Sequence, residues 1–331
     1  MSDTGSRSAG SRPVRGRFAP SPTGPLHFGS LVAALASFLE ARRHGGEWLL
    51  RIEDVDTPRS APGAADAILH ALDRHGLYWD GSVWYQSQRR DCYQAALERL
   101  LRAGLAYPCT CTRRELAAHS IRARDGSPIY PGHCRGGMRQ PGRPAAIRLR
   151  VADTSLTFQD ALQGSYEQCL NQEVGDFVIR RADGLFAYQL AVVVDDAAQR
   201  ITQIVRGGDL LDSTPRQIYL QTLLGLPTPT YAHLPVAVDR RGHKLGKQTG
   251  AAPLDLDRPG LALLAALRFL GQNPPLELSG EPPAAILAWA HTHWRLERVP
   301  AIPARRWYPQ RAREPAPDRL TQAIELLDLE R

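Results

Sequence analysis

The chain has 331 residues, of which 43% are hydrophobic and 23% charged, so composition excludes intrinsic disorder for most of its length and predicts about two globular domains. Lysines and arginines outnumber acidic residues by seven, a surplus compatible with nucleic acid or nucleotide partners. The longest apolar runs fall far short of the ~20 residues of a membrane span, and five cysteines, an odd number, favour a reducing compartment, so we expect a cytoplasmic protein with no membrane partner.

The first hundred residues alternate between strand and helix patterns. Residues 1–13 read as a disordered tail without the apolar core of a secretory signal. A strand is expected at 15–20, a helix over 29–43, a strand at 48–52, and helices over 62–75 and 91–103. This order predicts the α/β class, with a Rossmann-like parallel sheet of the nucleotide-binding kind.

The remaining chain predicts an insertion, a second α/β half and a helical end. Residues 109–144 hold three cysteines among many Gly, Pro and Arg, with little periodicity. An apolar run predicts a buried strand over 187–195, another strand is expected at 201–205, and Asp212-Ser213-Thr214-Pro215 predicts a helix start. We expect a first catalytic half at 14–108, an insertion at 109–172, a second half at 173–250 and a short helical C-terminal part at 251–331.

The segment from Arg17 to Ser30 joins the first strand to the first helix. The unpaired N–H groups at the start of a helix favour a phosphate, and His27 can donate a hydrogen bond to the same anion. Gly29 lets a flat base approach the backbone. The alternative is a structural turn in which His27 only caps the helix.

A second candidate is the loop that contains Lys244 and Lys247, which lies among glycines. Its lysines can close on a triphosphate, and Lys247 can neutralise charge that develops on leaving pyrophosphate. The acidic turn Glu53-Asp54-Val55-Asp56 follows a strand, so Glu53 can pair with a substrate ammonium. Taken alone, each of the two segments also fits a solvated surface loop.

Polar residues of the second half suggest a carboxylate ligand. Tyr188 and Arg206 end or flank its predicted strands, and the planar fork of arginine matches a carboxylate. With Arg17 at another strand edge, the pattern fits a substrate with two carboxylates. A surface ion pair is the alternative for each arginine.

The insertion predicts a structural zinc ion. Cys109, Cys111 and Cys134 are three thiols in a loop-rich segment, and such clusters in a reducing compartment bind Zn²⁺. His133, Tyr130 and His119 are all candidates for the fourth ligand, and the spacing matches no standard zinc finger.

In their order along the chain, these motifs resemble those of class I aminoacyl-tRNA synthetases. His27-Phe28-Gly29-Ser30 stands where that class has His-Ile-Gly-His, and Lys244-Leu245-Gly246-Lys247-Gln248 where it has Lys-Met-Ser-Lys-Ser. The runs 17–24 and 51–54 are similar to the glutamyl branch. Only 83 residues follow Gln248, too few for the full anticodon-binding region, so the chain resembles the truncated glutamyl-queuosine tRNA(Asp) synthetases.

The resemblance implies that ATP activates L-glutamate without tRNA and that the glutamyl group passes to the queuosine base in the anticodon of tRNA(Asp). It implies one structural Zn²⁺, Mg²⁺ that arrives with ATP, and a monomer. The implied glutamate-binding residues are Arg17, Phe18, Ala19, Pro20, Ser21, Glu53, Tyr188 and Arg206. The implied ATP-binding residues are His27, Gly29, Lys244 and Lys247, with His27 and Lys247 catalytic. The implied metal ligands are Cys109, Cys111, Tyr130 and Cys134. The resemblance thus favours Tyr130 over His133 as the fourth ligand.

Two positions depart from the pattern of the full-length enzymes. Gly246 replaces the usual serine of the lysine loop, and Val192 stands four residues after Tyr188 where an amide is expected. The Val192 departure fits a truncated relative of those enzymes.

Two alternatives stay open: a minimal glutamyl-tRNA synthetase that charges a tRNA 3′ end, and a non-enzymatic zinc RNA-binding protein. A dehydrogenase is disfavoured because no Gly-x-Gly-x-x-Gly follows the first strand.

Overall fold

A computed structural model describes residues 13–119, 121–124, 126, 128–246 and 250–307. The predicted tail therefore lies almost wholly outside the described residues. No helix within the described ranges is both long and apolar enough to cross a membrane.

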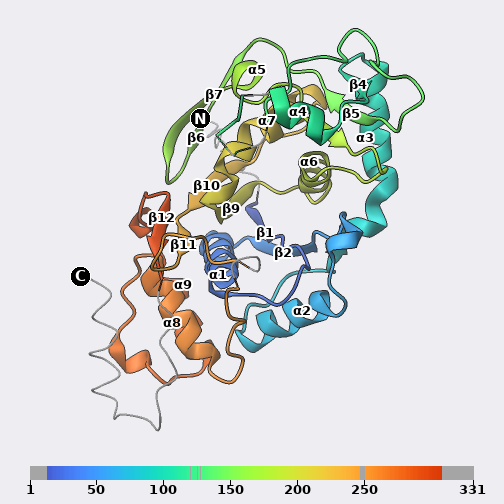
Figure 1. Cartoon of the computed structure of the whole chain (residues 1–331). Coiled ribbons are helices and arrows are strands. Elements are labelled where there is room, and N and C mark those ends of the chain that lie inside the picture. The colour runs from blue at the N-terminus through green and yellow to red at the C-terminus, as the bar shows by residue number, and fades with distance from the viewer. Residues whose placement is uncertain (1–12, 120, 125, 127, 247–249, 308–331) are drawn as a thin grey trace, which may run out of the picture.

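Two sets of parallel strands adjoin at the centre of the molecule (Figure 1). The first set has the order β1-β2-β3 and consists of β1 (Arg15–Phe18), β2 (Glu47–Ile52) and β3 (Trp84–Tyr85). The second contains the parallel pair β9 (Gln203–Gly207) and β10 (Thr230–Leu234). The backbone N–H of Thr202 donates to the carbonyl of Arg15 at 3.0 Å, so β9 lies beside β1. The predicted α/β fold with a Rossmann-like parallel sheet is confirmed.

Helices cover both faces of this sheet. On one face lie α1 (Phe28–Arg43), α2 (Ala64–Arg74), α8 (Pro259–Phe269) and α9 (Pro283–His293), whose apolar side chains share one core with β1 and β2. The other face carries α6 (Tyr188–Ala198) and α7 (Thr214–Leu223), which share a second core with α3 (Arg90–Arg102). Figure 1 shows α1 and α2 on one side of β1 and β2, and α6 and α7 on the other.

The predicted strand over 187–195 is wrong, because these residues form most of helix α6. Both faces of this segment are buried, with Leu190 to Val193 fully enclosed, and an apolar run of this kind looks the same in a buried helix and in a buried strand. The predicted strand at 201–205 is present as β9, two residues later. The predicted helix start at Asp212–Pro215 is confirmed, since α7 begins at Thr214 with proline in its first turn.

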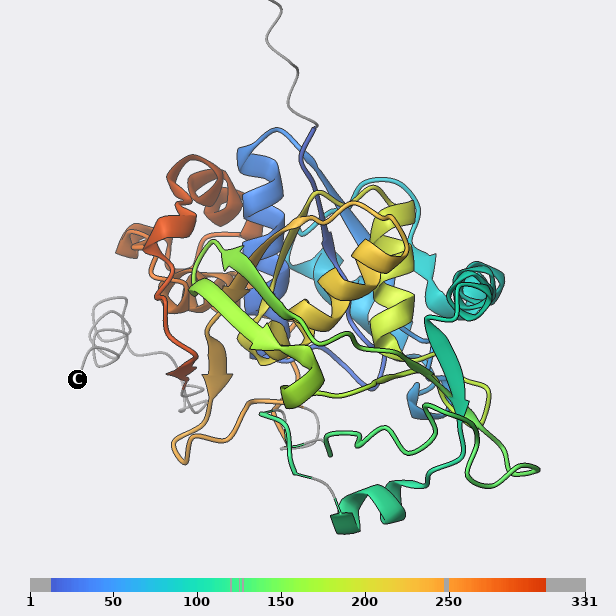
Figure 2. The same cartoon turned by 90° about the horizontal axis from the view of Figure 1, so that it is seen from above.

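The insertion is built on a small antiparallel sheet of β4 (Ala106–Cys109), β5 (Ala146–Leu149) and β8 (Val178–Arg180). Its helices are α4 (Arg113–His119) and α5 (Leu170–Glu173). The hairpin of β6 (Ser155–Asp160) and β7 (Gly164–Cys169) joins the second half of the central sheet through β10. Seen from above, α4 and the loop after β11 extend from the same side of the molecule (Figure 2).

The C-terminal part is held by one strand as well as by its helices. Strand β12 (Ala304–Arg306) pairs in parallel with β11 (Val236–Val238), directly before the lysine loop. Trp307 then stacks on Phe28, with ring centroids 3.6 Å apart. The mainly helical prediction for 251–331 missed this strand because its partner is distant in sequence.

A buried carboxylate fastens α1 to the C-terminal part. The indole N–H of Trp294 donates to Glu40 at 2.6 Å, and both side chains are buried. Gln203 and His44 contact the second oxygen of Glu40, at 3.4 and 3.2 Å. One carboxylate therefore joins α1, β9 and the end of α9.

We predict that Trp294→Phe lowers the free energy of unfolding by about 2 kcal/mol or more, because a buried charge loses a donor and the smaller ring leaves space. Urea unfolding measures the change. Trp289→Phe is the matched control, since Trp289 lies partly exposed on α9 and stacks on His293. Equal losses in the two variants would contradict this role of Glu40.

Candidate functional site

The turn between β1 and α1 forms one wall of the candidate site. His27 is the N-cap of α1, and its Nδ1 accepts the backbone N–H of Ser30 at 3.3 Å. In the neutral ring the proton therefore lies on Nε2. The carbonyl of Pro20 accepts the N–H of Glu53 at 3.0 Å, which ties this turn to the one after β2. His27 thus caps the helix through Nδ1.

The stem of the lysine loop lies against this turn. Strand β11 folds back on the loop through a bridge between Val238 and Lys244, and Leu254 N–H donates to the carbonyl of Leu26 at 3.0 Å. A Cβ at Gly29 would lie 3.7 Å from the carbonyl oxygen of Leu245. The two segments that resemble synthetase signatures are therefore neighbours in space.

The structure describes only one of the two lysines in this loop. Lys244 forms an ion pair with Asp209 at 2.5 Å, which links the loop to the segment after β9. Lys247 lies outside the described residues, as do Gln248 and Thr249. The described stem of the loop nevertheless reaches the turn before α1, because Leu245 lies beside Gly29.

A buried group of charges lies where β1 and β2 end. Asp196, on α6, accepts hydrogen bonds from Nε of Arg17 at 3.3 Å and from Nη2 of Arg51 at 2.8 Å. Arg51 also contacts Glu53 at 3.2 Å, and all four side chains are buried. Burial raises the pKa of Glu53, and Arg51 and Arg17 oppose that effect. The first and second halves of the sheet are thus joined by balanced ion pairs.

Tyr188 and Arg206 belong to the same region. Burial raises the pKa of Tyr188, the Glu53 carboxylate raises it further, and Arg206 and Arg17 lower it. Tyr188 shares α6 with Asp196, and β9, which carries Arg206, packs beside β1, which carries Arg17. Tyr188 begins α6 and does not end a strand as predicted, whereas Arg206 lies within β9. Val192, one turn after Tyr188, is fully buried in the core.

The sequence reasoning missed the roles of Arg51, Asp195 and Asp196. Asp195 accepts from Arg89 at 2.5 Å and from the hydroxyl of Tyr93 at 2.6 Å. An Asp-Asp pair after a long apolar run was the available signal, because a buried acid needs a buried partner.

The other acids of the turn after β2 are structural. Asp54 accepts the N–H and hydroxyl of Ser87, at 2.8 and 2.6 Å, and Asp56 pairs with Arg59 and Arg181, at 2.7 and 3.0 Å. The surface-loop interpretation therefore suits Asp54 and Asp56, whereas Glu53 faces the cluster.

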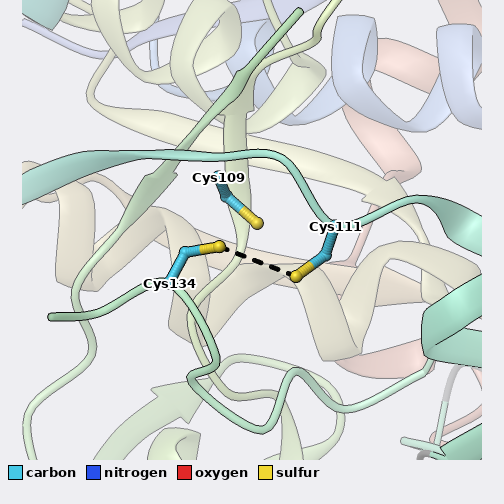
Figure 3. A group of neighbouring side chains, drawn as sticks. All are labelled: Cys109, Cys111 and Cys134. Carbon is cyan, nitrogen blue, oxygen red and sulfur yellow. Dashed lines mark hydrogen bonds between the residues drawn. The ribbon is translucent and has the colours of Figure 1, made fainter. Parts of the chain in front are cut away.

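The cysteine cluster is a candidate metal centre in the insertion (Figure 3). The Sγ atoms of Cys109, Cys111 and Cys134 all lie within 4.8 Å of one another. Burial raises the pKa of Cys111 to about 11. Burial has the same effect on Cys134, but backbone hydrogen bonds from Arg139 and Thr110 outweigh it and lower its pKa to about 6. Three converging thiols can hold a metal ion.

Tyr130 is the oxygen donor nearest these thiols. Its hydroxyl lies 3.3 Å from Sγ of Cys109 and 3.7 Å from Sγ of Cys111, and it accepts the N–H of Cys134 at 2.8 Å. Gly175 contacts the Tyr130 backbone at a positive φ of 69°, and a Cβ there would lie 2.6 Å from the Tyr130 carbonyl oxygen. The ring of His133 is 6.3 Å from that of Tyr130. The side chain of His119 lies outside the described part of the chain.

Arg148 completes the surroundings of the cluster. Its Nε donates to Sγ of Cys109 at 3.3 Å, and its guanidinium lies 3.8 Å from the centre of the Tyr130 ring. Arg148 therefore contacts both Cys109 and Tyr130. No local pattern predicts this contact, because Arg148 lies on the neighbouring strand β5.

The chain is similar to known proteins over most of its length. Residues 13–277 match the family described as tRNA synthetases class I (E and Q), catalytic domain. The glutamyl-Q tRNA(Asp) synthetase of Dechloromonas aromatica is 58% identical over 289 residues, which cover 87% of this chain and 96% of that protein. The protein of the same name from Aromatoleum aromaticum is 60% identical over 289 residues, 87% of this chain and 91% of its own length.

A solved structure shows a similar fold. The glutamate tRNA ligase of Elizabethkingia meningosepticum, in complex with its amino acid, superposes with a TM-score of 0.72 at 26% identity. The match covers 90% of this chain and 67% of that one.

We predict that Asp196→Asn flattens the acid dependence of stability. Burial raises the pKa of Asp196, but Arg17 and Arg51 outweigh it and hold the pKa below its usual value. The stabilisation is therefore complete above the unfolded pKa of ~3.9 and is lost as pH falls through the folded one. Urea unfolding between about pH 3 and 7 should show a steeper loss toward acid for the unaltered chain than for the variant. Parallel curves would contradict this.

Proposed function

Because this chain belongs to the class I tRNA synthetases of the glutamate and glutamine type, and within them to the glutamyl-Q tRNA(Asp) synthetases, we propose that it activates L-glutamate with ATP and transfers the glutamyl group to queuosine in the anticodon of tRNA(Asp). The carrying observation is the meeting of three segments: the His27 turn, the lysine-loop stem, and the Arg17–Glu53–Tyr188–Arg206 group.

The charged group suits an amino acid with two carboxylates. Arg17 and Arg206 bind the carboxylates together with Tyr188, and Glu53 binds the ammonium. Nη1 of Arg206 is buried and has no hydrogen-bond partner among the described residues, so a substrate carboxylate would satisfy it. The backbone from Phe18 to Ser21 lines the same site beside Glu53, through the bond between Pro20 and Glu53.

The His27 turn and the lysine loop suit ATP. The start of α1 and Nε2 of His27 offer donors to phosphate, and Gly29 leaves room beside the backbone. Lys244 and Lys247 add positive charge from the loop. Mg²⁺ that arrives with ATP supplies further charge to the phosphates.

Two displacements complete the reaction. An oxygen of the glutamate α-carboxylate attacks the α-phosphorus, the bond to the bridging oxygen breaks, and pyrophosphate leaves. A hydroxyl of queuosine then attacks the carbonyl carbon of glutamyl-adenylate, loses its proton and expels AMP. No protein nucleophile is needed, so positioning and charge stabilisation carry the catalysis. His27 and Lys247 stabilise the charge that develops on the phosphates.

The insertion and the C-terminal helices form the RNA-binding part. Residues 109–150 hold nine arginines and two acidic residues, and Arg113, Arg114 and Arg139 are exposed. Such a surface favours the phosphates of an anticodon stem-loop, whose unpaired bases are the readable part of an RNA. We propose that the protein acts as a monomer, and a tRNA substrate fits a cytoplasmic protein.

The decisive experiment is ATP–pyrophosphate exchange with glutamate in the absence of RNA. We expect exchange, and a loss of about 10²-fold or more in Lys247→Ala, because that lysine stabilises the leaving pyrophosphate. Absence of exchange in the unaltered chain would support the non-enzymatic alternative.

Transfer of labelled glutamate then identifies the acceptor. We expect label on tRNA(Asp) that contains queuosine, even when its 3′-terminal adenosine has been removed, and none on tRNA(Asp) without queuosine. Label that depends on the 3′ adenosine would support the minimal glutamyl-tRNA synthetase.

We propose one structural Zn²⁺ on Cys109, Cys111, Tyr130 and Cys134, because these four donors converge and a tetrahedral set of this kind suits zinc. Metal analysis of Cys111→Ser should show loss of zinc. Tyr130→Phe should bind zinc more weakly in a chelator competition, since one ligand is gone. His133→Ala is the control and should keep its zinc; loss there would make His133 the fourth ligand.

A further inference from the structure

A buried Asp–His pair lies directly behind the proposed glutamate site. Asp160 ends β6 and His233 lies in β10, and both side chains are fully enclosed. Oδ2 of Asp160 lies 2.6 Å from Nδ1 of His233. Neither residue belongs to the groups proposed above to bind glutamate, ATP or metal. Burying two such polar side chains costs free energy unless their donors and acceptors form hydrogen bonds.

The surroundings of Asp160 fix which ring nitrogen of His233 carries the proton. Oδ1 of Asp160 accepts three backbone N–H groups, from Leu162, Gln163 and His233, at 3.0, 2.9 and 3.1 Å. Burial opposes ionisation of Asp160, but the His233 and backbone hydrogen bonds outweigh it and lower its pKa. An ionised carboxylate can only accept, so Nδ1 of His233 must donate to it. Nε2 is then the acceptor of the neutral ring.

That acceptor faces Arg206. Nε of Arg206 donates to Nε2 of His233 at 3.1 Å. Nη2 of Arg206 donates to Thr214 and Gln217, each at 2.8 Å. Burial and the Arg206 charge lower the pKa of His233 to about 4, so the ring stays neutral and keeps its acceptor near neutral pH. The guanidinium is held at Nε and Nη2, and Nη1 is buried without a hydrogen-bond partner among the described residues.

We propose that Asp160 and His233 are positioning residues: Asp160 sets the tautomer of His233, and His233 orients the Arg206 guanidinium that receives a glutamate carboxylate. This rests on the proposed function and deepens it. The pair acts on glutamate binding through Arg206 and has no role in binding ATP.

Asp160→Asn tests the tautomer. The amide oxygen can still accept the three backbone N–H groups, but its NH₂ then faces Nδ1 of His233. The ring proton must move to Nε2, where it meets the Nε–H of Arg206 donor to donor. We expect the KM for glutamate in ATP–pyrophosphate exchange to rise about tenfold or more, since a buried charged hydrogen bond is lost, while the KM for ATP stays within about twofold.

His233→Gln and His233→Leu form the matched pair. Oε1 of glutamine can accept from Arg206 in place of Nε2, whereas leucine offers a similar volume and no acceptor. We expect glutamine to keep the KM for glutamate within about threefold of the unaltered chain, and leucine to raise it about tenfold or more. This pair decides the question by itself if Asp160→Asn fails to fold.

Nitrogen-15 NMR of labelled histidine gives a readout independent of activity. The His233 resonances are those missing from the spectrum of His233→Gln. We expect a protonated Nδ1 in the unaltered chain and a protonated Nε2 in Asp160→Asn. The opposite tautomer in the unaltered chain would overturn the inference.

The kinetic outcomes separate this inference from the proposed function. No glutamate-dependent exchange in the unaltered chain defeats the proposed function. Exchange in the unaltered chain with an unchanged KM for glutamate in folded Asp160→Asn and His233→Leu overturns the positioning role alone. Equal rises in both KM values, or glutamine no better than leucine at position 233, also overturn it.

Discussion

The ion pairs of Asp196 with Arg17 and Arg51 hold the site together. They join the ends of β1 and β2, from the first half of the chain, to helix α6 from the second half. Charges at this depth are tolerated only when they are balanced, and here the arginines and carboxylates alternate. The helix that carries Asp196 also begins with Tyr188, so the same ion pairs tie the start of α6 to the first half of the sheet. The proposed glutamate site therefore depends on the closure of the two halves.

The second constraint comes from the C-terminal part. Strand β12 pairs with β11 just before the lysine loop, and Trp307 stacks on Phe28 just after His27. Glu40 and Trp294 fix the same part to α1. A short C-terminal region thereby braces both signature segments, although it lies far from them in sequence. Tyr130, beside the cysteine cluster, is likewise held by distant residues: Gly175 leaves room for its backbone, and Arg148 lies over its ring.

Much of the architecture follows from local pattern. Spacing of apolar residues, a capping residue and a glycine pair fixed helix α1, and proline in a first turn located α7. The segment 187–195 was predicted wrongly, because an apolar run that is buried on all sides shows no hydrophobic periodicity. The cysteines could be selected from sequence, but sequence could not choose among the nearby oxygen and nitrogen donors, because His133 adjoins Cys134 in the chain whereas only folding brings the Tyr130 hydroxyl to the thiols.

By itself, the sequence determined the α/β class and the two signature segments, because each is encoded within a few consecutive positions, and it supplied the residue types of the proposed dicarboxylate site. Tertiary structure decided which charges meet. Arg17 and Asp196 are 179 positions apart, and Asp160 and His233 are 73 apart. No local pattern relates residues at such separations; only the pairing of strands and the need to neutralise buried charge brings them together.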